Sequence, residues 1–342
     1  MIRPAQANPE LCVIAAVAAR DEARAQEFAE KHGIATVHSS YEDLINDPDI
    51  DAIYNPAPNG LHAEWTILAL LQGKAVLCEK PLCSNAEEAR VMEEARVRSR
   101  GVAVEASHWS YHPQFEQMRA WLCDEARGPI TRWEITFNVP EGAMPLDDVR
   151  YDINLGGGAL MDLGHYPLNA LRKYSGMEPA VVSAVSTPPP PGVGDARIDQ
   201  SLEAELAFPD GSTAGLECSM WAESFSMELR VTYEDGCTGR VRSYLSPGSK
   251  GVIWDKDGAV SEELTSDSPL ADALGVQSSA GPGEPVLTYD LQLAAFVAEM
   301  RGEGLCHTTF DDAILNMELT DGAQPTLPRG FEQLQWAGAR GS

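Results

Sequence analysis

Basic residues are scarce in this chain of 342 residues, where 25 lysines and arginines stand against 52 aspartates and glutamates and give a formal net charge of -27. Nucleic acids and anionic membrane surfaces attract proteins through basic patches, so this charge argues against both as partners. No run approaches the roughly 20 consecutive apolar residues that cross a bilayer. The start, Met1–Gln6, is too short and too polar for a secretory signal. We therefore expect a cytoplasmic protein.

Cysteine patterns that would build a disulfide framework or a zinc site are missing. The seven cysteines are scattered and odd in number, and neither a Cys-x-x-Cys pair nor a Cys/His cluster with zinc-ligand spacing occurs. We expect reduced thiols, and the sequence implies no metal.

A glycine-rich phosphate-binding turn is missing too. A dinucleotide-binding domain opens with a strand, a Gly-x-Gly-x-x-Gly turn and a helix. Here neither the strand nor the turn precedes Leu11, and Met1–Pro9 is typical of the back half of that helix. The first strand is central in such a sheet, so its loss should expose the edges of both neighbours. Two explanations stay open: a start codon assigned too late, which the coherent downstream pattern favours, and a truncated chain.

What the sequence does contain is a regular alternation of short apolar runs and helical patterns. Strands are expected at 11–18, 36–38, 51–55, 75–78 and 102–105, and helices at 21–31, 41–45, 61–71 and 85–100. Strands that alternate with helices are typical of a parallel sheet. The pattern predicts a doubly wound, Rossmann-type α/β domain over residues 1–107, its first strand apparently absent.

Beyond residue 107 the pattern changes to strands separated by turns. Strands are expected at 130–138, 181–186, 201–208, 213–219 and 227–233, and Asp210-Gly211 is a strong hairpin signal between two of them. Residues 108–342 are therefore predicted to form an α+β domain with a large, mostly antiparallel sheet. Because this sheet is broad and partly apolar, we expect a homodimer or homotetramer.

Three segments, Tyr54–His62, Cys78–Leu82 and Gly156–Pro167, occur in the order and context of one family. Together they resemble the glucose–fructose oxidoreductase and inositol dehydrogenase (Gfo/Idh/MocA) family, and the resemblance covers nearly the whole chain. It is closest to the branch of dihydrodiol, xylose and glucose–fructose enzymes. The resemblance implies an NAD(P)-dependent oxidoreductase that transfers hydride between a nicotinamide and a sugar, polyol or cyclic diol.

The predicted catalytic residues are Lys80, Asp162 and Tyr166. Lys80 directly follows a buried strand, at the sheet edge where ligands bind in open α/β folds. Asp162 and Tyr166 are four residues apart, on one face of a helix, and Gly156–Gly158 before them would let the backbone approach a ligand. The resemblance implies that Tyr166 exchanges the proton. Lys80 would polarise the oxygen and lower the tyrosine pKa towards working pH, and Asp162 would bind a substrate hydroxyl.

Other residues are assigned to the cofactor and the substrate. Arg20 ends the second strand of the pattern, where an arginine suits a 2′-phosphate, so NADP is favoured and NAD stays an alternative. The loop Pro58-Asn59 and His62 would line the nicotinamide ribose. His165, one position off the catalytic face, is expected to support the site, and Tyr111 is a candidate for the substrate pocket. The full cofactor set is Arg20, Pro58, Asn59, His62, Glu79, Lys80 and Pro81, and the substrate set is Lys80, Tyr111, Asp162, His165 and Tyr166.

Two rival functions stay open. The missing glycine-rich turn favours a catalytically silent binding or regulatory protein, against which the intact set of Lys80, Asp162 and Tyr166 argues. The other rival is a lyase or glycosidase that uses a tightly held NAD for transient oxidation.

Overall fold

The computed structural model describes residues 1–245, 253–255, 258–260 and 268–324. The amino-terminal part follows the predicted alternation closely. Its strands are β1 (Ala16–Ala18), β2 (Thr36–His38), β3 (Ala52–Asn55), β4 (Ala75–Cys78) and β5 (Ala103–Glu105). Between them run α2 (Glu22–His32), α3 (Tyr41–Asn46), α4 (His62–Leu71) and α5 (Ala86–Ser99), after a short α1 (Ile2–Ala7).

Local signals in the sequence explain where these helices begin and end. The side chain of Asp21 caps α2 by accepting a hydrogen bond from the N–H of Arg24, and Gly33 ends the helix in the left-handed region with φ of 71°. Asn85 caps α5 in the same way through the N–H of Glu88. Capping residues and a left-handed glycine of this kind are readable without a structure, so the predicted helix ends are close to the observed ones.

The parallel strands form two separate sheets. Within the described residues β1 pairs with β2 alone, and β3, β4 and β5 form a second sheet in which β3 is an edge. The expected pair of unpaired edges is therefore confirmed. The strand predicted at 11–18 is largely wrong, because only Ala16–Ala18 pair and Val13 is 74% exposed. With a neighbour on one side only, β1 has little to bury this apolar run against.

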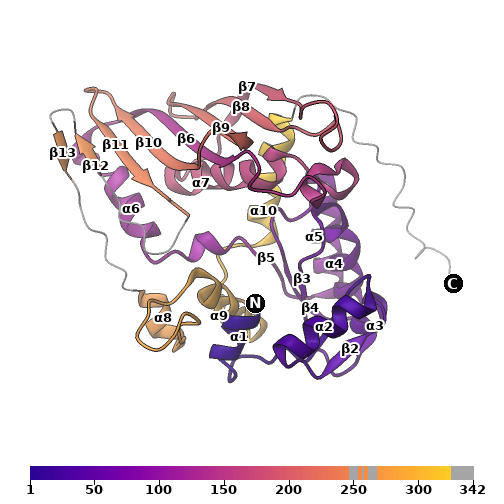
Figure 1. The fold of residues 1–342 in the computed structure, drawn as a ribbon. Helices are drawn as coiled ribbons and strands as arrows, with labels where there is room; N and C mark the ends of the chain where they lie inside the picture. The colour runs from indigo at the N-terminus through magenta and orange to yellow at the C-terminus, as the bar shows by residue number, and fades with distance from the viewer. Residues whose placement is uncertain (246–252, 256–257, 261–267, 325–342) are drawn as a thin grey trace.

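A larger sheet beyond residue 107 has six strands in the order β11-β10-β6-β9-β8-β7. They are β6 (Ile130–Pro140), β7 (Ala180–Thr187), β8 (Ser201–Ala207), β9 (Thr213–Ala222), β10 (Ser226–Tyr233) and β11 (Thr238–Arg242). Every pair is antiparallel except β6 with β9, which confirms the mostly antiparallel prediction. The helix α7 (His165–Ser175) lies along one face of this sheet (Figure 1).

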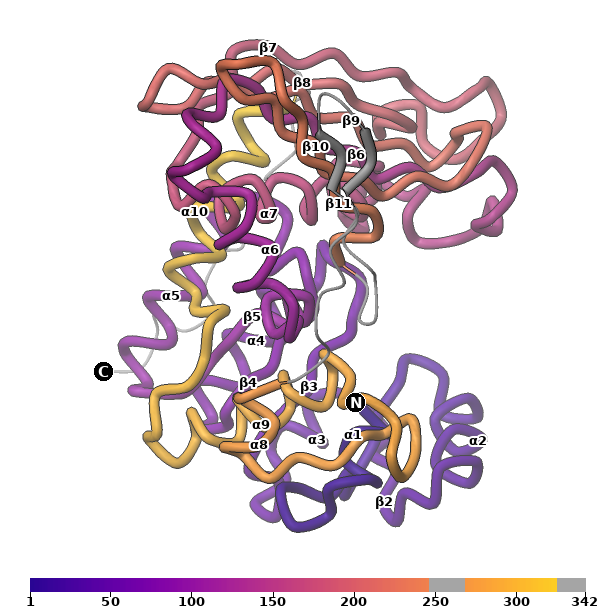
Figure 2. The backbone as a smooth tube through the Cα atoms, turned by 90° about the vertical axis from the view of Figure 1, so that its left-hand side faces the viewer, coloured from indigo at the N-terminus to yellow at the C-terminus, as the bar shows by residue number. Residues whose placement is uncertain are grey.

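The chain returns to the first part of the molecule near its end. The helix α9 (Thr288–Met300) packs against α1, and α10 (Phe310–Ala323) packs against α5, β5 and α7. Figure 2 shows α9 beside the parallel strands and α10 extending from there towards the six-stranded sheet. The division of the chain at residues 107 and 108 stays a prediction. Among the described residues no helix is long and apolar enough to span a membrane.

Candidate active site

Lys80 makes the central contact of the site, between the two parts of the molecule. It follows β4 directly, and the Lys80–Pro81 peptide bond is cis. Its Nζ donates to Oδ1 of Asp162 at 3.0 Å and to the backbone carbonyl of Asp162 at 2.9 Å. The same ammonium lies 4.6 Å from the centroid of the Tyr166 ring. The three residues predicted to be catalytic are thus in direct contact.

Asp162 and Tyr166 are carried by a helix that is irregular at its start. Asp162 lies in a π-helical turn, Leu160–Gly164, which continues into α7 at His165. Such turns occur frequently at functional sites, since they redirect side chains within a helix. The hydroxyl of Tyr166 has no hydrogen bond to any residue that the structure describes, which leaves it available to a ligand.

Burial and nearby charges shift the pKa values of Asp162 and Tyr166 in opposite directions. Burial raises the pKa of Asp162, but the charges of Lys80 and Arg150 lower it further than that, so the carboxyl stays ionised. Burial also raises the pKa of Tyr166, and here the charge of Lys80 lowers it by less. The expected depression of the tyrosine pKa is therefore wrong for the protein without ligand.

Arg150 completes the site, and sequence reasoning missed it. Its Nε donates to Oδ2 of Asp162 at 2.6 Å, and its Nη1 donates to Oδ1 of Asp148 at 3.0 Å. Nothing in the local pattern distinguishes this arginine from a surface residue, because it lies in the short 3-10 turn Val149–Tyr151 between longer elements. The contact depends on the fold of the loop around the glycines.

The glycines Gly156–Gly158 approach protein atoms, contrary to the expectation that they make room for a ligand. A Cβ on Gly157 would overlap the carbonyl oxygen of Arg150, and one on Gly156, whose φ is 74°, would lie 2.8 Å from the Cβ of Asn59. The N–H of Gly158 donates to the same Arg150 carbonyl at 3.0 Å. The absence of side chains lets this loop close over the backbone of Arg150.

His165 is fully buried next to Tyr166, one of the residues predicted to be catalytic. Its Nδ1 accepts a hydrogen bond of 3.0 Å from Nδ2 of Asn316, and its Nε2 lies 3.7 Å from Oε2 of Glu105. Burial and the charge of Lys80 lower its pKa to about 3, so the ring is neutral. This burial agrees with the expected auxiliary role and keeps the ring out of contact with solvent.

The residues assigned to the cofactor lie at the carboxyl ends of the strands. Oε1 of Glu79 accepts a hydrogen bond of 2.6 Å from the Tyr54 hydroxyl, while its Oε2 accepts the N–H of Lys80 at 3.2 Å. Pro58 precedes the short 3-10 turn Asn59–Leu61. The amide of Asn59 donates to the carbonyl of Gly156 at 3.0 Å, so this side chain links the two parts of the molecule.

Arg20 and His62 differ in whether their polar side-chain atoms are accessible to a ligand. Arg20 lies just beyond β1 and is exposed. His62 is completely buried, and its ring nitrogens lie 2.9 Å from the carbonyl of Pro81 and 2.6 Å from that of Ala57. His62 therefore joins the two loops and has no ring nitrogen left for a ribose.

Tyr111 is not brought to the site. It is buried against Ala271, Leu291 and Ala295. Its hydroxyl lies 3.2 Å from Sγ of Cys306. The prediction that Tyr111 lines the substrate pocket does not agree with this position. The tyrosine precedes a Pro-containing turn in the sequence, and only the packing shows that its ring points into a core.

Two aromatic residues that the sequence did not single out lie beside Tyr166. The ring of His108 stacks on that of Tyr289, with centroids 4.0 Å apart, and meets the Tyr166 ring edge-on at 6.4 Å. His108 follows β5 and Tyr289 is the second residue of α9, so residues 181 positions apart form one wall. Burial and the charge of Lys80 lower the pKa of His108 to about 3.

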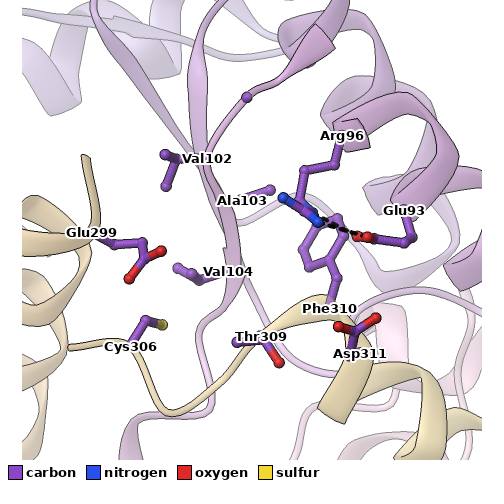
Figure 3. A pocket seen from close by; sticks show the side chains of 11 residues that line it. Glu93, Arg96, Val102, Ala103, Val104, Glu299, Cys306, Thr309, Phe310 and Asp311 are labelled. Atoms are coloured by element: carbon purple, nitrogen blue, oxygen red, sulfur yellow. Dashed lines mark hydrogen bonds and ion pairs between the residues drawn. The ribbon is translucent and has the colours of Figure 1, made fainter. Parts of the chain in front are cut away.

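A cavity of about 250 Å³ lies elsewhere, around the first residues of β5 (Figure 3). Acidic side chains of α5, α9 and α10 and the thiol of Cys306 border it, and Arg96 is paired with Glu93 across its rim. None of Lys80, Asp162 and Tyr166 lines it. The cavity is therefore distinct from the candidate active site.

Two family models match the chain in sequence. The model of an oxidoreductase family with an NAD-binding Rossmann fold, GFO_IDH_MocA, matches residues 1–108, and the model of its C-terminal domain matches residues 115–238. The two matched regions cover most of both predicted domains. Both models agree with the resemblance inferred from the motifs.

Individual relatives extend the comparison. The chain is 37% identical over 206 residues to D-xylose 1-dehydrogenase (NADP(+)) 2 of Haloferax volcanii, a match that spans 60% of this chain and 61% of that protein. It is 31% identical over 327 residues to the uncharacterized oxidoreductase ORF334 of Rhizobium meliloti, covering 96% and 92% of the two chains. Among solved structures, that of KijD10, a 3-ketoreductase from Actinomadura kijaniata in complex with NADP and TDP-benzene, has a TM-score of 0.80 at 25% identity. That alignment covers 94% of this chain and 91% of KijD10.

Proposed function

The chain belongs to the GFO_IDH_MocA oxidoreductase family, and from that premise we propose that it transfers hydride between NADP and a sugar, polyol or cyclic diol. One observation carries the proposal. Lys80 contacts both the carboxylate of Asp162 and the ring of Tyr166, while the Tyr166 hydroxyl has no hydrogen-bond partner among the described residues. A cation, a fixed carboxylate and an available phenol are the groups that proton exchange with a carbinol requires.

The residues present fit two ends of the cofactor. The exposed guanidinium of Arg20 suits the 2′-phosphate of NADP, and Pro58, Asn59, Glu79 and Lys80 lie where the nicotinamide end is expected. In the described part of the chain no glycine-rich turn supplies backbone N–H groups for the pyrophosphate. When bound, the nicotinamide would supply the hydride acceptor or donor.

The chain's own groups would manage the proton and the substrate oxygen. The substrate hydroxyl would lie between the Tyr166 hydroxyl and Nζ of Lys80, within reach of both. In reduction the Tyr166 phenol would donate its proton to the substrate oxygen, and in oxidation its phenolate would take the hydroxyl proton. Lys80 would stabilise the negative charge that develops on that oxygen, and Asp162 would hold the lysine in place.

The first experiment is a titration of the purified chain with NADPH, followed by nicotinamide fluorescence, and then an assay of NADPH formation from NADP with D-xylose and trans-1,2-cyclohexanediol. We expect saturable binding and turnover. Lys80→Met should reduce turnover about 100-fold or more, because one proton-transfer group contributes roughly 10²–10⁴-fold, and should leave NADPH binding measurable. Lys31→Met, on the exposed end of α2, is the control and should change neither.

Other outcomes would favour the rival functions. A folded chain that binds no NADPH would support a silent binding protein, a reading that the separate parallel sheets also favour. Cofactor that co-purifies without net NADPH formation would support a lyase or glycosidase. Turnover unchanged in Lys80→Met would contradict the assigned catalytic role.

We also propose that the six-stranded sheet mediates a homodimer or homotetramer. On its edge strand β7, Val182 and Val185 are 68% and 69% exposed, and such apolar exposure supports a protein contact. Sedimentation velocity of the wild type beside a Val182→Lys, Val185→Lys double variant tests this, since charges there should favour the monomer.

A further inference from the structure

Arg150 and Lys80 bind the two oxygens of one carboxylate. Nζ of Lys80 is 3.0 Å from Oδ1 of Asp162, and Nε of Arg150 is 2.6 Å from Oδ2. Because the two oxygens belong to a single carboxyl group, both cations lie close to Asp162 and therefore near one another. A ring whose reacting oxygen meets Lys80 would therefore bring a neighbouring oxygen close to Arg150.

Part of the Arg150 guanidinium is available for such an oxygen. Nε and Nη1 donate to Asp162 and Asp148, but Nη2 has no hydrogen-bond partner among the described residues. The side chain is 38% exposed, so part of it is open to solvent. The remaining N–H groups of Nη2 can donate to a ligand.

The position of Arg150 is fixed by its surroundings. The Gly158 N–H donates to its carbonyl, and Gly157 has no room for a side chain against the same oxygen. The carboxylates of Asp148 and Asp162 hold the side chain from two directions. A donor held in this way loses little conformational freedom when it binds a ligand.

The charges around Arg150 indicate the kind of ligand. The two cations, Lys80 and Arg150, are balanced by the two anions, Asp148 and Asp162. The carboxylate of Glu79 accepts the N–H of Lys80 and adds further negative charge. No excess positive charge is left to offset a carboxylate or phosphate on the substrate, so a neutral polyol is favoured over its acid.

From these contacts we propose that Arg150 is a substrate-binding residue whose Nη2 donates to a second oxygen of a neutral polyhydroxylated substrate. This inference rests on the proposed function, because it places the reacting oxygen at Lys80 and Tyr166. It assigns specificity for a vicinal diol to the pair Lys80 and Arg150. The carboxylate of Asp162 sets the spacing between them.

The test measures ligand binding directly, by saturation-transfer NMR titrations with D-xylose, trans-1,2-cyclohexanediol and D-xylonate in the presence of NADP. We expect the neutral ligands to bind the wild type more tightly than xylonate. Arg150→Met should weaken the neutral ligands about tenfold, since a hydrogen bond to a charged group typically contributes that much. Arg150→Lys keeps the charge but loses the planar fork, so its loss should be intermediate.

Arg197→Met is the matched control. Arg197 is also paired with an aspartate, Asp195, but it is 60% exposed and does not contact Asp162. This variant should bind like the wild type. If Arg150→Met does not fold, the binding of Arg150→Lys is compared with that of the wild type instead, because this variant retains a cation beside Asp162.

Three results would overturn the inference: unchanged binding in both Arg150 variants, tighter binding of xylonate than of xylose, or no binding of either neutral ligand to the wild type. Failure of the proposed function is distinct. A wild type that binds a neutral diol through Arg150 but forms no NADPH would leave this inference standing and remove the dehydrogenase assignment.

Discussion

Oε1 of the Glu105 carboxyl group accepts a hydrogen bond of 2.8 Å from the backbone N–H of Leu82, two residues after Lys80. Its other oxygen faces Nε2 of His165 at 3.7 Å. Because the Asn316 amide donates to Nδ1 of that ring, the hydrogen of the neutral imidazole is on Nε2 and points at Glu105. Buried polar groups therefore lie between the lysine loop and the helix that carries Tyr166.

Replacing Glu105 should change how stability depends on pH. Burial raises the pKa of Glu105 to about 8, so the folded protein keeps this proton at pH values where the unfolded chain has lost it. The stabilisation is complete below the unfolded pKa and is lost as pH rises to about 8. Wild type should therefore lose stability relative to Glu105→Gln by about 1.4 kcal/mol per pH unit between pH 5 and 8. Urea unfolding at several pH values measures this slope. In the control Glu27→Gln, which changes an exposed residue, the unfolding free energy should depend on pH as it does in the wild type.

Asp162→Asn should destabilise the protein and stop turnover. The substitution leaves Lys80 and Arg150 facing each other without the charge that pairs them. Breaking a mostly buried ion pair from one side costs about 3 kcal/mol. Urea unfolding gives this value, and Asp195→Asn, which breaks an exposed pair, should cost less than about 1 kcal/mol. Equal effects of the two substitutions would contradict the central position of Asp162.

Tyr166→Phe should separate catalysis from stability. Because the hydroxyl bonds to none of the described residues, its removal breaks no internal hydrogen bond, and the ring keeps its contacts with Lys80 and Phe137. We expect less than about 1 kcal/mol change in unfolding free energy and a loss of turnover of about 10²-fold or more. A stopped-flow assay of NADPH formation tests the loss of turnover, and a thermal melt tests the small change in stability. Turnover that survives would identify another proton acceptor.

Gly157→Ala should disturb the site through Arg150. The new methyl group would overlap the Arg150 carbonyl, so the loop must shift, at a cost of about 1–3 kcal/mol. Gly322→Ala is the control. Gly322 lies inside α10, and a Cβ there would make only ordinary van der Waals contacts with Val181. Alanine should be neutral or stabilising there. Thermal melts of both variants test whether the glycines are needed for close packing.

Local patterns were sufficient for most of the secondary structure. Apolar runs, helix caps such as Asp21 and turn glycines such as Gly211 act over a few residues, so β2 and β4 begin and end where they were predicted. The run at 11–18 is the exception. A strand needs a neighbour, and the sequence does not say which edges are occupied.

Some residues of the site were predicted from the sequence, and others became apparent only in the structure. Lys80, Asp162 and Tyr166 were identified from short motifs, and the structure places them in contact. Arg150 and Glu105 have no motif. Arg150 acts through Asp162, which lies on the helix after the glycine loop. Glu105 lies near His165, 60 residues further along the chain. Both contacts are visible only after folding.

By itself the sequence determined the order of elements, the family and the three motif residues, because caps, periodicity and motifs are local properties of the chain. The tertiary structure decided which charges meet Asp162, why three glycines adjoin Arg150, and that burial outweighs the effect of Lys80 on the Tyr166 pKa. Each of these results depends on atoms from several segments of the chain, so it is decided by how the segments pack.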